Sequence, residues 1–258
     1  LHRVMIDRAR AMNLRCNLQH RDIFEAIHRV KVEQVNHHAT ATHSKFLRQR
    51  QNMLTDREVL STINMLRSEH LDVRTVTMGI NLFDCASSDF DTFAYKVRSK
   101  IFRYAEKLVE TCDLVGDRYG IPVVNKRISV SPIGTVGASF SRDEMVAACR
   151  VLDESAKEVG VDFIGGFGAL VEKGMTPGEK NLIDALPEAL AVTDRICSSM
   201  NVGSTKAGIN MDAVRLMGQR ILDVAEATRD RDAIGCAKLV VFCNIPQDVP
   251  FMAGAYLG

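Results

Sequence analysis

Segments typical of β-strands alternate with segments typical of α-helices from Met53 onward, and this alternation restricts the fold more than any other feature. Strands are expected where β-branched residues cluster, at residues 73–82, 122–132, 161–170, 194–204 and 237–245. Apolar residues at helical spacing predict helices that begin near Thr55 and then cover residues 89–119, 142–159, 178–192 and 208–228. Strands joined by helical crossovers predict an α/β fold with a mainly parallel sheet of five strands.

Ligands of such sheets bind beyond the carboxyl ends of the strands. In this chain those ends fall at residues 82–88, 130–137, 166–174, 201–207 and 244–254. The fourth of them lies within an unusually polar stretch, CSSMNVGSTKAGINM, at residues 197–211. A binding site is therefore expected first in this stretch.

The segment Gly203–Lys206 is expected between the end of a strand and the start of a helix. Its backbone N–H groups, its two hydroxyls, its ammonium group and the helix dipole could together hold a phosphate or a carboxylate. The alternative is an N-cap, in which Ser204 or Thr205 only starts the next helix. The polar strand before the segment favours binding, because hydroxyls and amides are costly to bury without partners. The predicted ligand-binding residues are Ser198, Ser199, Asn201, Gly203, Ser204, Thr205 and Lys206.

Three residues are candidates for a catalytic role: Cys197, Asp84 and Lys126. Cys197 is either a nucleophile or radical relay, or a buried thiol that packs as a small apolar side chain. Asp84 is either a ligand-binding or metal-binding carboxylate, or a turn residue. Its negative charge would raise the pKa of the neighbouring Cys85 thiol, which argues against a reactive thiolate there.

Lys126 belongs to the run Asn125-Lys126-Arg127, which interrupts an otherwise apolar strand. Strand alternation sends Lys126 to one face of the sheet, and Asn125 and Arg127 to the other. Charges on an internal strand need partners, so a place inside a barrel or a cleft is one interpretation. The alternative is an edge strand whose charges are solvated.

Several common kinds of site are excluded by residues that the sequence lacks. No histidine occurs from Leu71 to Gly258, so Ser–His–Asp triads, Cys–His dyads and histidine-ligated zinc are not available there. No Walker motif is present, and GGFG at residues 165–168 lacks the spacing of the GxGxxG dinucleotide motif. No metal site is predicted, and the cofactor, if any, is left open.

Composition and charge are those of a globular protein. The hydrophobic fraction is 46%, and 25% of residues are charged with a net charge of +1, which gives no electrostatic reason to expect nucleic acid or membrane as a partner. No apolar run approaches the ~18 residues of a membrane-spanning helix, and the N-terminal residues contain no apolar signal-peptide core. The 7 cysteines form no CxxC motif, which favours free thiols and a cytoplasmic location.

Residues 1–52 differ in composition from residues 53–258. They contain no glycine or proline, six of the 7 histidines, and ten Lys and Arg against four Asp and Glu. A basic arm that binds nucleic acid is one interpretation. The segment has few aromatic residues and no recognisable module, so we favour an extension outside the functional domain, which is expected to comprise residues 53–258.

Five long segments resemble those of uncharacterised protein family 0210, also called domain of unknown function 711 and described as PFL-like. They are LDVRTVTMGINLFDC (71–85), GIPVVNKRISVSPI (120–133), GVDFIGGFGALVEKG (160–174), CSSMNVGSTKAGINMDAV (197–214) and AKLVVFCNIPQDVPFMAGAYLG (237–258). The resemblance covers residues 53–258. It implies the ten-stranded α/β barrel of pyruvate formate-lyase and ribonucleotide reductase, of which this chain would form one half, with a C-terminal half missing.

The resemblance implies no activity, because neither the glycine loop nor the cysteine loop of glycyl-radical enzymes is found in the sequence. It does imply a partner, since family members are commonly encoded beside a small ACT-domain protein. Two functions are therefore weighed against a purely structural role for the polar motifs. One is an enzyme that acts on a small anionic metabolite in the barrel mouth, and the other is a ligand-sensing or regulatory protein that works with an ACT-domain partner. Substrate, reaction and oligomeric state, including a homo-oligomer, stay open.

Overall fold

The computed structural model describes residues 56–67 and 73–245. The chain divides into two compact units, one made of Asp72–Asp113 with Pro122–Gly258, and the other of Leu1–Leu71 with Leu114–Ile121. In the second unit, the described elements are α3 (Asp56–Arg67) and the C-terminal part of α5 (Leu108–Tyr119). The boundary predicted at residues 52 and 53 lies outside the described residues.

The first unit contains a sheet with five parallel strands and one short antiparallel strand. The parallel strands are neighbours in chain order: β1 (Val73–Ile80), β2 (Val123–Val130), β3 (Phe163–Leu170), β4 (Ile196–Ser204) and β6 (Leu239–Cys243). The sixth strand, β5 (Gly208–Ile209), folds back antiparallel on the end of β4. The predicted α/β fold, with five strands in a mainly parallel sheet, is therefore confirmed, and β5 is an addition.

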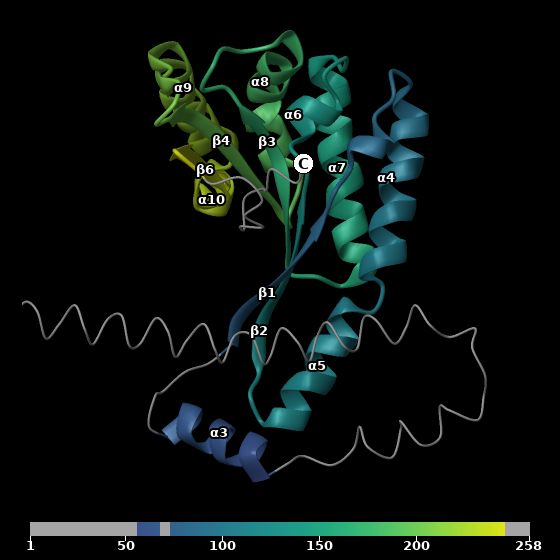
Figure 1. The fold of residues 1–258 in the computed structure, drawn as a ribbon. Helices are drawn as coiled ribbons and strands as arrows, with labels where there is room; N and C mark the ends of the chain where they lie inside the picture. The colour runs from purple at the N-terminus through teal and green to yellow at the C-terminus, as the bar shows by residue number, and fades with distance from the viewer. Residues whose placement is uncertain (1–55, 68–72, 246–258) are drawn as a thin grey trace, which may run out of the picture. The chain divides into compact units, whose positions relative to one another are not determined.

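Four helices form one layer on one face of the sheet. They are α4 (Phe90–Ala105), α7 (Arg142–Val159), α8 (Pro177–Ala191) and α9 (Met211–Ala227). Each packs against the next in this order, and the layer contacts β1, β3 and β4 (Figure 1). Helices that follow the order of the strands in this way result from successive crossovers of the same hand. The described helical segments other than these four, α3 and α5 are short: η1 (Phe83–Cys85), α6 (Ile133–Val136), η2 (Arg229–Arg231) and α10 (Ile234–Ala237).

Local sequence signals fix the ends of the central helices. Ser141 and Glu144 form a capping box at the start of α7, and Thr176 and Glu179 form another at the start of α8. Helix α7 ends at Gly160, whose φ of 78° is the left-handed conformation that favours glycine. These helices begin and end close to the positions predicted from the sequence.

Two helix predictions were wrong in detail. The single helix expected over residues 89–119 is two helices, because α4 ends at Ala105 and α5 begins at Leu108. The helix expected from residue 208 begins at Met211, because Gly208 and Ile209 pair with β4 and the side chain of Asn210 caps the helix by accepting the N–H of Ala213.

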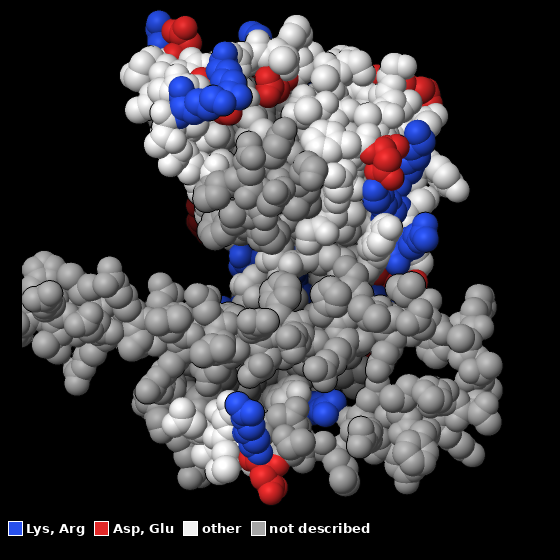
Figure 2. Space-filling model, viewed as in Figure 1, with Lys and Arg blue, Asp and Glu red and all other residues white. Residues whose placement is uncertain are grey.

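The hydrophobic core lies between the sheet and the helix layer. Strand residues that face the helices are apolar and buried: Ile80, Ile128, Val130, Ile164, Phe167, Ile196, Met200 and Val202. On the face shown in Figure 2, basic and acidic side chains of the described part lie close to one another, and no large patch of one sign is visible there. Within residues 56–67 and 73–245, no helix is both long and apolar enough to cross a membrane.

Candidate functional site

The face of the sheet opposite the helix layer carries mostly small and polar side chains on β1, β2 and β4, whereas Phe163 on β3 and Val240 and Phe242 on β6 are apolar residues of the same face by register. In β4, Ile196, Met200 and Val202 belong to the core, so the alternate residues point the other way. The same alternation applies in β2, where Ile128 and Val130 are core residues. We call the opposite surface the polar face, defined by Thr75, Thr77 and Gly79 of β1, Asn125, Arg127 and Ser129 of β2, Gly165 and Gly168 of β3, and Cys197, Ser199 and Asn201 of β4.

Arg127 is the charged residue of the polar face. It lies on β2 between β1 and β3, so it is not on an edge strand. Its guanidinium carbon lies 5.2 Å from the centroid of the Phe163 ring, within the range of a cation–π interaction. Its Nε is buried without a hydrogen-bond partner, and no described carboxylate forms an ion pair with it. The alternation predicted for Asn125, Lys126 and Arg127 is confirmed.

Ser129 lies two residues further along the same strand and is fully buried. Its register partners are Gly79 on β1 and Gly165 on β3, and Gly165 is in turn the partner of Cys197 on β4. Glycines on both sides leave the hydroxyl without neighbouring side chains in the sheet. The Ser129 Oγ has no hydrogen-bond partner, which is uncommon for a buried hydroxyl.

Cys197 lies on the polar face and is 2% exposed. Burial raises the pKa of its thiol to about 11, although the positive charges of Arg127 and Lys238 act in the opposite direction. The thiol is therefore protonated at neutral pH. Such a group can donate a weak hydrogen bond, but it is not an activated nucleophile.

The other two candidates for catalysis are paired on the helix side of the sheet. The Lys126 Nζ lies 2.9 Å from the Asp113 Oδ1, and the hydrogen bond that Lys126 donates to Asp113 raises the pKa of Lys126. Asp84 forms an ion pair with Lys100 of α4, and that hydrogen bond lowers the pKa of Asp84. The structure therefore does not place Lys126 beside Cys197, and it gives both Lys126 and Asp84 a structural partner.

The segment Gly203–Lys206 forms a hairpin turn between β4 and β5, so the predicted helix start at this point is wrong. The Ser204 Oγ accepts the N–H of Ala207 at 3.0 Å. The Thr205 N–H and hydroxyl both donate to the Asn244 Oδ1, at 3.0 and 3.1 Å. Helix α9 begins after this turn, and its N-cap residue is Asn210. Neither the helix dipole proposed for anion binding nor the N-cap role proposed for Ser204 or Thr205 therefore applies to this segment.

The predicted ligand-binding residues divide between the two faces of β4. Ser199 and Asn201 lie on the polar face, and the Asn201 side-chain amide, in the orientation that satisfies both of its ends, donates to the carbonyls of Phe242 and Gly203 at 3.2 and 3.0 Å. Ser198 points to the helix side and donates its hydroxyl hydrogen bond to the Phe167 carbonyl. Lys206 is exposed at the turn.

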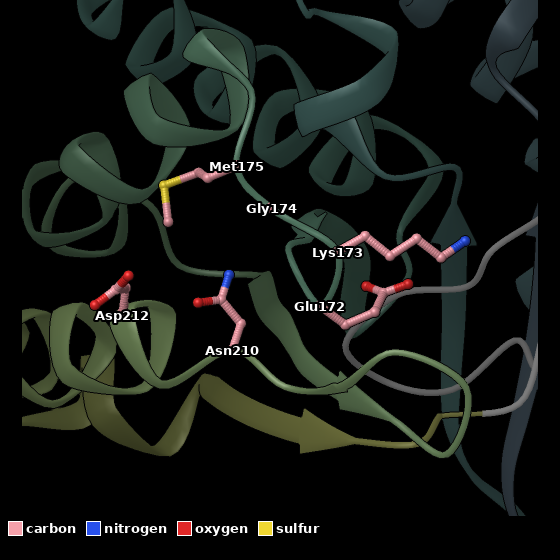
Figure 3. A pocket seen from close by; sticks show the side chains of 6 residues that line it. All are labelled: Glu172, Lys173, Gly174, Met175, Asn210 and Asp212. Carbon is pink, nitrogen blue, oxygen red and sulfur yellow. The ribbon is translucent and has the colours of Figure 1, made fainter.

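An open hollow of about 390 Å³ lies beyond the carboxyl end of β3 (Figure 3). Its lining residues are Glu172, Lys173, Gly174, Met175, Asn210 and Asp212. The Asn210 side chain is already engaged, because its Nδ2 donates to the Val171 carbonyl and its Oδ1 accepts from Ala213. None of the predicted site residues lines this hollow. The part of the chain that the structure describes also contains no group of three or more His, Cys, Asp or Glu residues that could hold a metal ion.

Comparison with known proteins identifies the family. The family model described as "Uncharacterised ACR (DUF711)" matches residues 64–258, which is most of the chain. The chain belongs to the DUF711 (UPF0210) family. Curated relatives that carry the name UPF0210 protein include those of Oleidesulfovibrio alaskensis and Syntrophobacter fumaroxidans, which are 71% and 66% identical over 206 residues, and that of Methanosarcina mazei, which is 55% identical over 206 residues.

These alignments cover 80% of this chain and 45% to 46% of each relative. This DUF711 chain thus spans a little under half the length of the relatives that it matches. The family resemblance seen in the sequence is confirmed, and the matched range contains β1 to β6 with the polar-face residues.

Proposed function

We propose that this DUF711 chain binds a small anionic metabolite on the polar face of its sheet. The observation that carries the proposal is the composition of this face. Arg127, a cation, is the only charged residue that the described strands contribute to it. Around it lie the hydroxyls of Ser129 and Ser199 and the thiol of Cys197, together with the ring of Phe163. A cation among neutral donors is the arrangement that an anion requires.

We further propose that the five parallel strands form one half of a ten-stranded barrel, with the polar face turned inward. Parallel sheets are usually covered on both faces, and the described helices cover only one. The greater length of the relatives supports this arrangement, because they have enough additional chain for a second half. The metabolite would then lie inside the barrel.

Binding without turnover is favoured over catalysis by the state of the candidate catalytic groups. The Cys197 thiol is protonated at neutral pH, and Lys126 and Asp84 are held in ion pairs on the helix side. A ligand-sensing role is therefore the form of the proposal that these contacts support, and the ACT-domain partner is added to it from the family resemblance alone. An enzyme acting on the same anion is the second candidate.

The test is a thermal-shift screen of the 258-residue chain against anionic, neutral and cationic metabolites at constant ionic strength. An anion that binds only the folded state stabilises it by about 2.7 kcal/mol when its concentration is 100 times the dissociation constant. We expect saturable shifts with anions alone. Product analysis of each hit separates an enzyme from a sensor, and the absence of a saturable shift with any anion would refute the proposal.

A further inference from the structure

We propose that Arg127 and Ser129 anchor a carboxylate group of the ligand, above the row of small residues Gly79, Ser129, Gly165 and Cys197. This inference rests on the proposed function and names the chemical group that the polar face recognises. Neither residue was among the site residues predicted from the sequence. Strand β2 supplies the positive charge and the hydroxyl of this site. Strands β1, β3 and β4 supply the small residues that lie beside Ser129 in register.

Arg127 differs from the other basic residues that lie within the fold. Arg195 donates from Nη1 to the carbonyls of Ala156 and Val161 at 3.1 and 2.6 Å, and Lys238 donates to that of Thr193 at 2.7 Å. Lys126 is paired with a carboxylate. Arg127 instead has an aromatic ring on one side and a buried Nε without a partner. A guanidinium in this state lacks the anion that normally accompanies it.

Ser129 differs in the same way from other buried serines. The hydroxyl of Ser198 is bonded to the Phe167 carbonyl, and that of Ser155 donates to the Val151 carbonyl at 2.7 Å. The Ser129 hydroxyl has no such acceptor, although the residue is fully buried. Because its neighbours in register are glycines, no side chain of the adjacent strands lies beside it. Ser129 thus supplies a hydroxyl without a hydrogen-bond partner two residues from Arg127, whose Nε also has none.

The geometry favours a carboxylate over a phosphate. A guanidinium presents a planar fork that matches the two oxygens of a carboxylate, and the cation–π contact with Phe163 restricts its position. The neighbouring donors, the Ser129 hydroxyl and the Cys197 thiol, are neutral. Phosphate sites usually add several main-chain N–H groups, but those of β2 and β3 are engaged in the ladder of the parallel sheet. One positive charge with neutral donors suits a single carboxylate.

The experiment is calorimetric titration of the 258-residue chain with propionate, succinate and inorganic phosphate at constant ionic strength. The variants are Arg127→Gln, Arg127→Lys and Ser129→Ala. Lys126→Gln is the matched control, because it removes a positive charge one residue away on the opposite face. Circular dichroism and melting curves show which variants remain folded, and Arg127→Lys and Ser129→Ala keep the test valid if Arg127→Gln does not fold.

We expect the carboxylates to bind and phosphate to bind at least about tenfold more weakly, which corresponds to the loss of one charge-assisted hydrogen bond. Arg127→Gln should weaken carboxylate binding by about ten- to a hundredfold, and Ser129→Ala by about two- to tenfold. Arg127→Lys should also weaken it, because an ammonium group lacks the fork. Lys126→Gln should change it by less than about twofold.

Three results would overturn the inference and leave the proposed function standing. In the first, other anions bind but propionate and succinate do not, and in the second, phosphate binds as tightly as these carboxylates. In the third, Lys126→Gln weakens carboxylate binding as much as Arg127→Gln does. Carboxylate binding that persists unchanged in both Arg127→Lys and Ser129→Ala would also overturn it. If no anion of any kind binds the parent chain, the proposed function itself is wrong.

Discussion

Replacing Ser129 with alanine should stabilise the ligand-free protein or leave its stability unchanged, although the residue is completely buried. The substitution removes only the Oγ, which has no hydrogen-bond partner in the fold. A buried, unsatisfied hydroxyl costs about 1–3 kcal/mol. Part of that gain is offset by the small void that the oxygen leaves, so we expect the free energy of unfolding to rise by about 0–1 kcal/mol.

Ser198→Ala is the matched control, since Ser198 is equally buried but donates its hydroxyl to the Phe167 carbonyl. Loss of that bond should lower the free energy of unfolding by about 1 kcal/mol, because the carbonyl loses a partner. Urea denaturation followed by circular dichroism measures both variants, and the slope with denaturant should stay constant. If Ser129→Ala loses as much stability as Ser198→Ala, the Ser129 hydroxyl has a partner in the folded protein and the reasoning fails.

The remaining predictions concern other parts of the chain. Iodoacetamide should modify Cys197 slowly at neutral pH, because a pKa raised from 9.0 to about 11 leaves about a hundredfold less thiolate. The rate of modification, measured by peptide mass spectrometry, should rise as the pH approaches 11. Fast labelling at pH 7 would contradict the prediction. Thr176→Ala, which breaks the capping box of α8, should cost about 1 kcal/mol of unfolding free energy, against almost no change for the exposed Lys206→Ala. Gly168→Ala should cost more than 1 kcal/mol, roughly the lower range for overpacking, because its Cβ would lie 2.3 Å from the Ser199 carbonyl oxygen; an unchanged melting curve would contradict the close approach. Deletion of residues 1–52 should leave the melting temperature unchanged, and a large decrease would show that they belong to the folded domain.

The strands could be predicted because their signal is local. Runs such as VRTVTMGI of β1 and the left-handed glycine at the end of α7 mark elements without knowledge of the rest of the fold. The break between α4 and α5 has no such mark, since Ala105 and Leu108 continue the spacing of buried residues along one helix face. The pairing of Gly208 and Ile209 was missed because a strand of two residues is too short for any period to appear.

The site was predicted less well than the fold because it depends on which face the helices cover. Alternation correctly separated Lys126 from Arg127, but it does not say which of the two lies against the helices. That depends on the hand and order of the crossovers, which brought α4, α7, α8 and α9 to one face. The sequence analysis therefore chose Lys126 as the candidate, whereas in the structure Lys126 is paired with Asp113 and Arg127 lies on the polar face with a buried Nε that has no partner.

The chemistry of the polar face restricts what can lie against it. An apolar surface packed over this face would leave the Arg127 Nε and the Ser129 hydroxyl without partners, at a cost of about 1–3 kcal/mol for the hydroxyl and more for the charged group. Water would satisfy both groups, but it would not balance the charge. A carboxylate does both, because it accepts from the guanidinium fork and from the hydroxyl while it neutralises Arg127. A covering segment of the protein could do so only if it placed an acidic side chain against Arg127. In that case free carboxylates would bind the 258-residue chain but would not bind a longer relative that contains such a segment.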